Sequence, residues 1–195
     1  MTPRIADTTA NTTGVHAPIG LALAPVDLST WDQHGGGDVF AVYIWTDVRP
    51  LRGASGLVDW RLSGRLSSLI QSGRLTGADG EQLLLPTAGR LPWPAVMVLG
   101  LGARTGFSAA RASAAVGRLL ETMRGLGVHD IAVAPPGRDV DALPARRAVE
   151  LLLAGARGRP QRDWLRRITI VEAAGVHKDL LDLIAEPGTA RRRGA

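Results

Sequence analysis

The sequence has no cysteine and a single lysine, Lys178, so 22 of its 23 Lys and Arg residues are arginines. The lack of cysteine excludes disulfides, thiolate metal sites and cysteine nucleophiles. No apolar run approaches the roughly 20 residues that a membrane-spanning helix needs. Residues 1–14 are rich in threonine and alanine and lack the apolar core of a secretory signal. We therefore expect a cytoplasmic protein without membrane contact.

The positive charge is spread along the chain. The net charge is +5, and only Arg191, Arg192 and Arg193 form a run. Replacement of lysine by arginine throughout is typical of a coding bias. Such a charge gives weak, salt-sensitive attraction to nucleic acid through phosphate contacts, without base recognition.

The length of 195 residues and the hydrophobic fraction of 45% are typical of one globular domain. We expect a flexible lead-in at 1–17, one folded domain at 18–187 and a basic, flexible tail at 188–195.

Apolar periodicity alternates between strand and helix patterns. The expected strands are Ile19–Ala24, Val39–Thr46, Leu83–Leu85, Ala95–Leu101, Ile131–Ala134 and Ile168–Val171. The expected helical segments are a short piece at Leu28–His34, a helix from Leu57 to Gly73, one capped by Ser108 and ending near Leu126, one opened by Asp141 and Pro144, and a last one around Leu180–Ile184. This order predicts an α/β domain in which a largely parallel sheet lies between helical layers.

Ligands of open α/β sheets bind beyond the carboxyl ends of the strands, where three loops are expected: Asp47–Gly56, Gly100–Gly106 and Ala134–Asp139. The first two are rich in glycine and precede helices, so their N–H groups are candidates for binding an anion. The candidate phosphate-binding residues are Gly53, Ser55, Gly56, Gly100, Gly102, Arg104, Thr105 and Gly106. The alternative is that these glycines only turn the chain, because Gly100, Gly102 and Gly106 depart from the dinucleotide-binding spacing by one residue.

The sequence shows no catalytic or metal-binding constellation. The four histidines are far apart and have no ligand partner three or four residues away. Asp139 and Asp141 are interpreted as turn and N-cap residues, and Ser55 as a helix cap. The five tryptophans are too scattered for a base-stacking platform. We expect no catalytic residue, no metal site and no cofactor.

Two stretches resemble the N-terminal domain of the cytosolic leucyl aminopeptidases. They are TDVRPLRGASGLVDWRLSGRLSSLIQSGRLTGADGEQLLLP at 46–86 and GRLPWPAVMVLGLG at 89–102. The resemblance implies a macro-like, three-layer α/β/α sandwich. In that family the domain carries no catalysis and precedes a larger domain with two metal ions. No segment like NTDAEGR is present here, so no catalytic or metal residue carries over.

Three functions remain open on this basis. The first is a stand-alone, non-catalytic interaction module that forms a homo-oligomer or binds a peptidase of the family. The second is a macro-like domain that binds ADP-ribose or another nucleotide phosphate. The third is a regulatory protein that binds DNA weakly.

Overall fold

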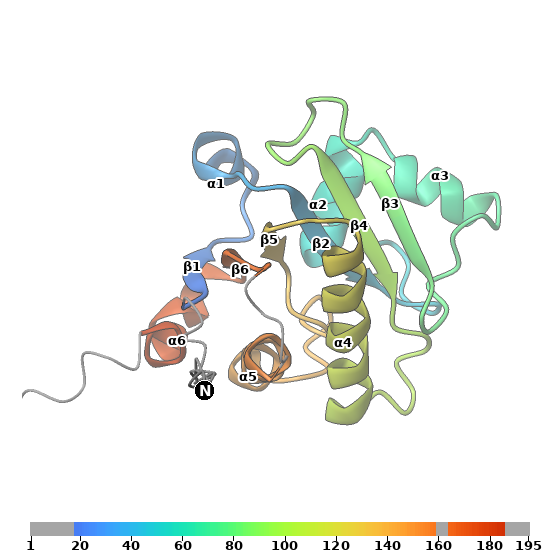
Figure 1. Ribbon diagram of the computed structural model, residues 1–195. Coiled ribbons are helices and arrows are strands. Elements are labelled where there is room, and N and C mark those ends of the chain that lie inside the picture. Colours follow the sequence, from blue (N-terminus) through green and yellow to red (C-terminus); the bar gives the residue numbers. More distant parts are fainter. Residues whose placement is uncertain (1–17, 159–163, 186–195) are drawn as a thin grey trace, which may run out of the picture.

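A six-stranded sheet forms the centre of the computed structural model, which describes residues 18–158 and 164–185 (Figure 1). The strands are β1 (Gly20–Ala24), β2 (Val39–Ile44), β3 (Gln82–Pro86), β4 (Ala95–Gly100), β5 (Asp130–Val133) and β6 (Arg167–Val171). The helices are α1 (Leu28–His34), α2 (Gly53–Arg61), α3 (Arg65–Gln71), α4 (Ala109–Gly125), α5 (Ala145–Arg157) and α6 (His177–Ile184), with a 3-10 turn at Ala174–Val176.

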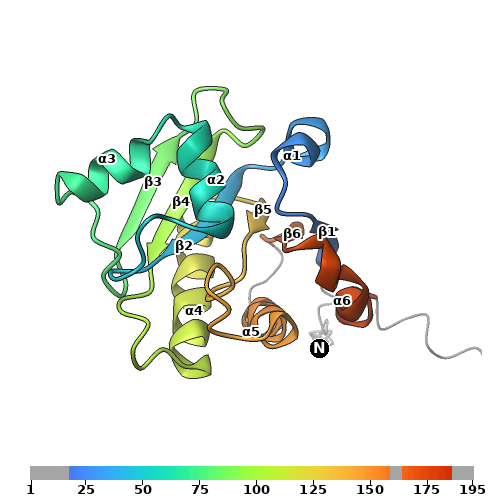
Figure 2. The same ribbon diagram turned by 180° about the vertical axis from the view of Figure 1, so that it is seen from behind.

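The strand order is β1-β6-β5-β2-β4-β3, and every neighbouring pair is parallel except β3 with β4. Helices α1, α2 and α3 cover one face of the sheet, and α4, α5 and α6 cover the other (Figures 1 and 2). The expected three-layer α/β/α sandwich with a largely parallel, mixed sheet is confirmed.

The position of β2 in the sheet explains why its sequence is apolar without alternation. All six of its residues are buried, because Phe40 and Val42 face α2 while Ala41 and Tyr43 face α4. A central strand with helices on both faces is expected to read as a continuous apolar run. The helix expected after Ser108 is also confirmed, since the Ser108 hydroxyl accepts a hydrogen bond from the N–H of Arg111 at the start of α4.

The expected helix from Leu57 to Gly73 is wrong in two respects. It is two helices, α2 and α3, separated at Gly64, which has a left-handed φ of 75°. In addition, α2 begins at Gly53, so the small residues Gly53 to Gly56 form its first turn and do not precede it. The apolar spacing continues across the break because both helices bury residues against the same face of the sheet.

Asp59 explains the break between the two helices. In a helix that began at Leu57 it would lie in the first turn, yet it lies in the second turn of α2 and is buried. Its carboxylate accepts hydrogen bonds from the N–H groups of Leu66 (2.7 Å) and Ser67 (3.1 Å). These groups belong to the first turn of α3, whose own N-cap is a glycine without a side chain. Asp59 therefore caps the next helix.

The expected flexible segments at 1–17 and 188–195 lie outside the described residues.

Candidate functional site

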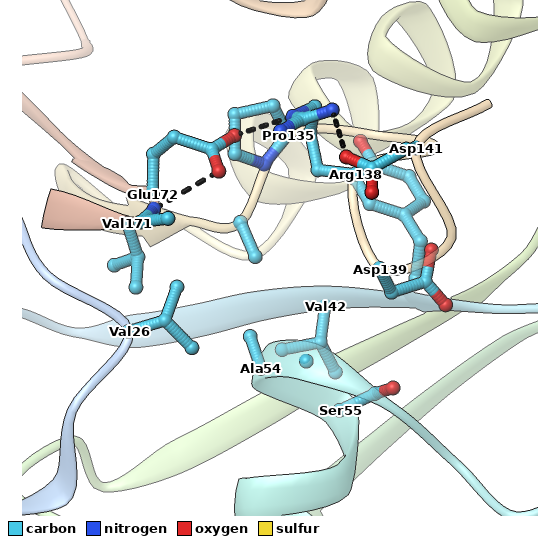
Figure 3. A pocket seen from close by; sticks show the side chains of 14 residues that line it. Val26, Val42, Ala54, Ser55, Pro135, Arg138, Asp139, Asp141, Val171 and Glu172 are labelled. Atoms are coloured by element: carbon cyan, nitrogen blue, oxygen red, sulfur yellow. Dashed lines mark hydrogen bonds and ion pairs between the residues drawn. The ribbon is translucent and has the colours of Figure 1, made fainter. Parts of the chain in front are cut away.

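A cavity of about 250 Å³ lies beyond the carboxyl ends of β2, β5 and β6 (Figure 3). Its walls come from the end of β2, the start of α2, the loop after β5 and the residues after β6. Ligands of open α/β sheets bind at this edge. The cavity is therefore the candidate functional site.

The first turn of α2 forms one wall of the cavity. Gly53 begins the helix with a φ of 55°, and Gly53, Ala54 and Ser55 line the cavity. The first N–H groups of a helix have no acceptor within it and favour a negative partner. Ser55 is not the N-cap that the sequence predicted. It lies inside α2, and its hydroxyl donates to the carbonyl of Arg52 at 2.9 Å.

Arg138 is the only lysine or arginine that lines the cavity in the part of the chain that is described, and it is held in an ion-pair network. Its Nε lies 2.8 Å from Oε2 of Glu172, and its Nη1 lies 2.8 Å from Oδ1 of Asp141 and 2.7 Å from the carbonyl oxygen of Leu143. Glu172 is 4% exposed, and its other oxygen accepts the N–H of Ala173. The charge of Arg138 is thus neutralised within the protein.

Asp139 lies between this network and the start of α2 (Figure 3). Its carboxylate accepts the indole N–H of Trp45 at 2.9 and 3.0 Å. Burial raises the pKa of the Asp139 carboxyl above its ordinary value, against the lowering effect of this hydrogen bond. The prediction that one of Asp139 and Asp141 caps the following helix is wrong. The N-cap of α5 is Pro144, without a side-chain hydrogen bond.

The raised pKa of Asp139 predicts a pH dependence of stability. An acid whose pKa is higher in the folded state stabilises the fold below its unfolded pKa, and this contribution is lost as the pH rises through the folded pKa. The wild type should therefore gain stability relative to Asp139→Asn as the pH falls from neutral to about 4. Urea unfolding of both proteins across this range measures the difference, and a constant difference would contradict the prediction.

The second glycine-rich loop lies outside the cavity. The N–H of Gly102 donates to the carbonyl of Gly77 at 2.8 Å, and the carbonyl of Gly102 accepts the N–H of Thr46. The N–H of Gly100 donates to the carbonyl of Glu81 at 2.8 Å. These groups pack the end of β4 against the segment before β3, so the two N–H groups already have acceptors within the protein.

The structure separates the candidate phosphate-binding residues. Gly53 and Ser55 line the cavity. Gly56 packs against the backbone, since a Cβ there would lie 2.8 Å from the carbonyl oxygen of Leu51. Arg104 is exposed, and its N–H donates to the carboxylate of Asp47 at 3.1 Å. The members of the set that do not line the cavity are Gly56, Gly100, Gly102, Arg104, Thr105 and Gly106.

Two residues of the cavity were missed by sequence reasoning. Arg138 lies inside the expected loop Ala134–Asp139, and neither it nor Glu172 is among the candidate residues predicted from the sequence. A signal was present for Glu172, because it follows the apolar strand Arg167–Val171 directly and therefore lies at the carboxyl edge of the sheet. Its partner is 34 residues away, and no local pattern identifies it.

Within 18–158 and 164–185, no three His, Asp or Glu side chains come close enough together to hold a metal ion. Over the same ranges, no helix combines the length and apolar character needed to cross a bilayer.

Comparison of the sequence with known families identifies the domain. The profile of the N-terminal domain of the cytosol aminopeptidase family matches residues 39–157. A probable cytosol aminopeptidase of Alkaliphilus metalliredigens is 28% identical over 100 residues, which are 51% of this chain and 20% of that protein. One of Pseudomonas syringae pv. tomato is 31% identical over 86 residues, which are 44% of this chain and 17% of that protein. The match spans about a fifth of these relatives.

Solved structures agree on the fold. The Trypanosoma brucei macrodomain in complex with ADP-ribose superposes with a TM-score of 0.66 at 14% identity, covering 85% of this chain and 69% of that one. A tomato leucine aminopeptidase mutant superposes with a TM-score of 0.55 at 16% identity, covering 86% of this chain and 36% of that one. The fold is thus like that of macrodomains, and the chain belongs to the cytosol aminopeptidase family, whose N-terminal domain it contains.

Proposed function

We propose that this chain is a non-catalytic interaction module, which binds a peptidase of its family or a second copy of itself. The observation that carries the proposal is Trp60 on α2, whose side chain is 68% exposed. It borders a shallow groove that Pro50 and Leu51 also line. Tryptophan is strongly enriched among the residues that dominate binding energy at protein interfaces. The names of the curated relatives support a cytoplasmic location as part of the same proposal.

The test is binding in solution to a full-length cytosol aminopeptidase of the family. Sedimentation velocity should show a complex larger than either protein alone. Trp60→Ala should weaken it about 30-fold, because truncation of such a residue costs about 2 kcal/mol. Leu126→Ala, which removes another exposed apolar side chain at the end of α4, is the matched control and should leave binding unchanged. Absence of any complex, with the peptidase or with itself, would contradict the proposal.

We also expect no aminopeptidase activity from the chain alone. The metal-dependent chemistry of such enzymes requires clustered ligands, and the described residues contain no group of three. Hydrolysis of a leucine amide is measured with manganese or zinc added. Cleavage that a chelator abolishes would overturn the non-catalytic assignment.

Binding of an anionic nucleotide is a second candidate, favoured by the N-terminus of α2 in the wall of the cavity. The charges around it oppose an anion, because Asp139, Asp141 and Glu172 outnumber Arg138. Calorimetric titration with ADP-ribose should therefore give no heat with the wild type.

Two arginine variants assign any binding that is observed. Binding that is lost in Arg138→Ala, while circular dichroism shows that this variant is still folded, would place the nucleotide in the cavity. Binding that Arg104→Ala removes would place it at the second glycine-rich loop. Either result would promote the second candidate over the interaction module.

A further inference from the structure

Strand β1 is an edge strand, and within residues 18–158 and 164–185 no other strand pairs with its outer side. It is the first strand in the sheet order, and its neighbour there is β6. Its sequence, GLALA, contains none of the charged residues or prolines that usually protect an edge from pairing with another chain. The opposite edge, β3, ends in Pro86. The two edges of the sheet therefore differ in how they are protected.

The hydrogen bonds to β6 show which groups of β1 are directed outward. The N–H of Gly20 donates to the carbonyl of Arg166 at 2.9 Å, and the carbonyl of Ala24 accepts the N–H of Glu172 at 3.0 Å. In a parallel ladder, alternate residues of a strand direct both backbone groups to the same neighbour. Gly20, Ala22 and Ala24 thus bond to β6, and Leu21 and Leu23 direct their N–H and C=O groups to the open side.

This arrangement is self-complementary. In an antiparallel pair of two β1 strands centred on Ala22, Leu21 of each copy lies opposite Leu23 of the other, and these residues exchange four hydrogen bonds. Ala22 meets its own copy at the non-hydrogen-bonded position, where the Cα atoms approach to about 4.5 Å. The methyl group of Ala22 permits that approach. The ladder ends at Pro25, which has no N–H to donate.

Helix α6 places an apolar side chain beside the same edge. Arg146 of α5 binds the side chain of Asp182 and the carbonyl of Asp179, so this side of α6 faces α5. Leu181 is two residues after Asp179 and therefore about 200° around the helix, on the side away from α5. It is 54% exposed. Figure 1 shows α6 below β1, with α5 to the right of α6.

The symmetry of an antiparallel pair brings these features together. Its two-fold axis is perpendicular to the sheet, so α6 of both copies lies on the same face and the two Leu181 side chains flank the axis. The axis also places the basic end of each β1, beside Arg167, next to the acidic end of its partner, near Asp27. On the opposite face, β1 borders a groove that Thr30 and Thr169 line, and Ala22 faces this groove.

We propose that two copies of this chain dimerise through β1 and α6, which joins their sheets into one continuous sheet. This inference rests on the proposed function in one respect, since it names a second copy as a partner. The face that carries Trp60 is not part of this interface and stays available to a different protein.

The test introduces a negative or a positive charge at position 22 of the full chain. Sedimentation equilibrium of the wild type should show a dimer. Ala22→Glu and Ala22→Arg should each weaken self-association at least about tenfold, because like charges meet across the axis. An equimolar mixture of the two variants should dimerise again. The longer side chains extend into the groove, so the monomer should keep its fold, which circular dichroism checks.

Leu84→Glu on the opposite edge, β3, is the matched control and should leave the dimer intact. Amide hydrogen exchange gives an independent readout, because the N–H groups of Leu21 and Leu23 should be protected in the wild type and exchange rapidly in Ala22→Glu. Leu181→Asp should also weaken the dimer.

Three results would overturn the inference. A dimer that Leu84→Glu or Trp60→Ala disrupts, but Ala22→Glu does not, would place self-association elsewhere and leave the proposed function standing. A monomeric wild type with protected Leu21 and Leu23 amides would mean that another part of the same chain covers the edge. A monomer with unprotected amides that still binds the peptidase would reject the dimer and keep the interaction module.

Discussion

Gly100→Ala is expected to destabilise the domain by about 3 kcal/mol or more. A Cβ at this position would lie 1.9 Å from the carbonyl oxygen of Ala78 and 2.7 Å from the carbonyl carbon of Gly77. Both are backbone atoms of a segment that is hydrogen-bonded to the end of β4. Gly100 is also paired with Ile44 of β2. The end of β4 therefore cannot move away from residues 77–78 without breaking its hydrogen bonds to β2. The glycine is required by the close approach of two backbones.

Urea unfolding measures this effect against two other glycine variants. Gly125→Ala in α4 meets no atom within 4 Å and should be neutral or stabilise by up to about 1 kcal/mol. Gly102→Ala should cost about 1 kcal/mol or more, because its φ of 73° is strained for alanine while the nearest atom is the movable end of Arg111. A Gly100→Ala protein as stable as Gly125→Ala would contradict the packing described for the second glycine-rich loop.

Glu172→Ala is expected to destabilise the domain by about 3 kcal/mol. Glu172 is 4% exposed and binds the guanidinium of Arg138, whose side chain is only 14% exposed. Removing one partner of a buried ion pair leaves the other charge without compensation in a poorly solvated place. Asp141 does not replace the lost partner, since it is 84% exposed and surrounded by water.

Two control variants distinguish the effect of an unpaired buried charge on Arg138 from general damage to the cavity wall. Asp141→Asn removes the negative charge from the solvent-exposed ion pair of Arg138 and keeps a residue type that tolerates the φ of 51° at this position. It should change the free energy of unfolding by no more than about 1 kcal/mol. The double variant Arg138→Met, Glu172→Gln removes both charges and should recover much of the stability lost in Glu172→Ala. If Asp141→Asn and Glu172→Ala destabilised the domain equally, burial would not be what makes the Glu172 ion pair the stronger of the two.

Local patterns in the sequence were sufficient for most of the architecture. The continuous apolar run at 39–46 indicated the strand β2, and Ser108 with the segment after it indicated α4. These predictions succeed because the spacing of apolar residues and the capping of helices both depend on residues a few positions apart. The same reasoning failed at α2 and α3, because the residue that ends one helix and starts the other, Asp59, acts on N–H groups seven and eight positions later.

The candidate site depended on tertiary structure to a greater extent. The sequence placed the loops at the carboxyl edge of the sheet and included Gly53 and Ser55 among the candidates. It did not show that the second glycine-rich loop packs elsewhere, against residues 77–81.

The chain by itself determined the α/β class, the apolar strands and the glycines that turn between them, because each of these follows from short-range periodicity and backbone geometry. Only the tertiary structure decided which charged groups line the cavity and which strand lies at the edge of the sheet. Asp139 meets Trp45 across 94 residues, and Arg138 meets Glu172 across 34. The outer position of β1 follows from its parallel pairing with β6, the last strand within the described residues. These residues are far apart in the sequence and meet only when the chain folds. Their contact therefore has no counterpart in the local spacing of apolar residues.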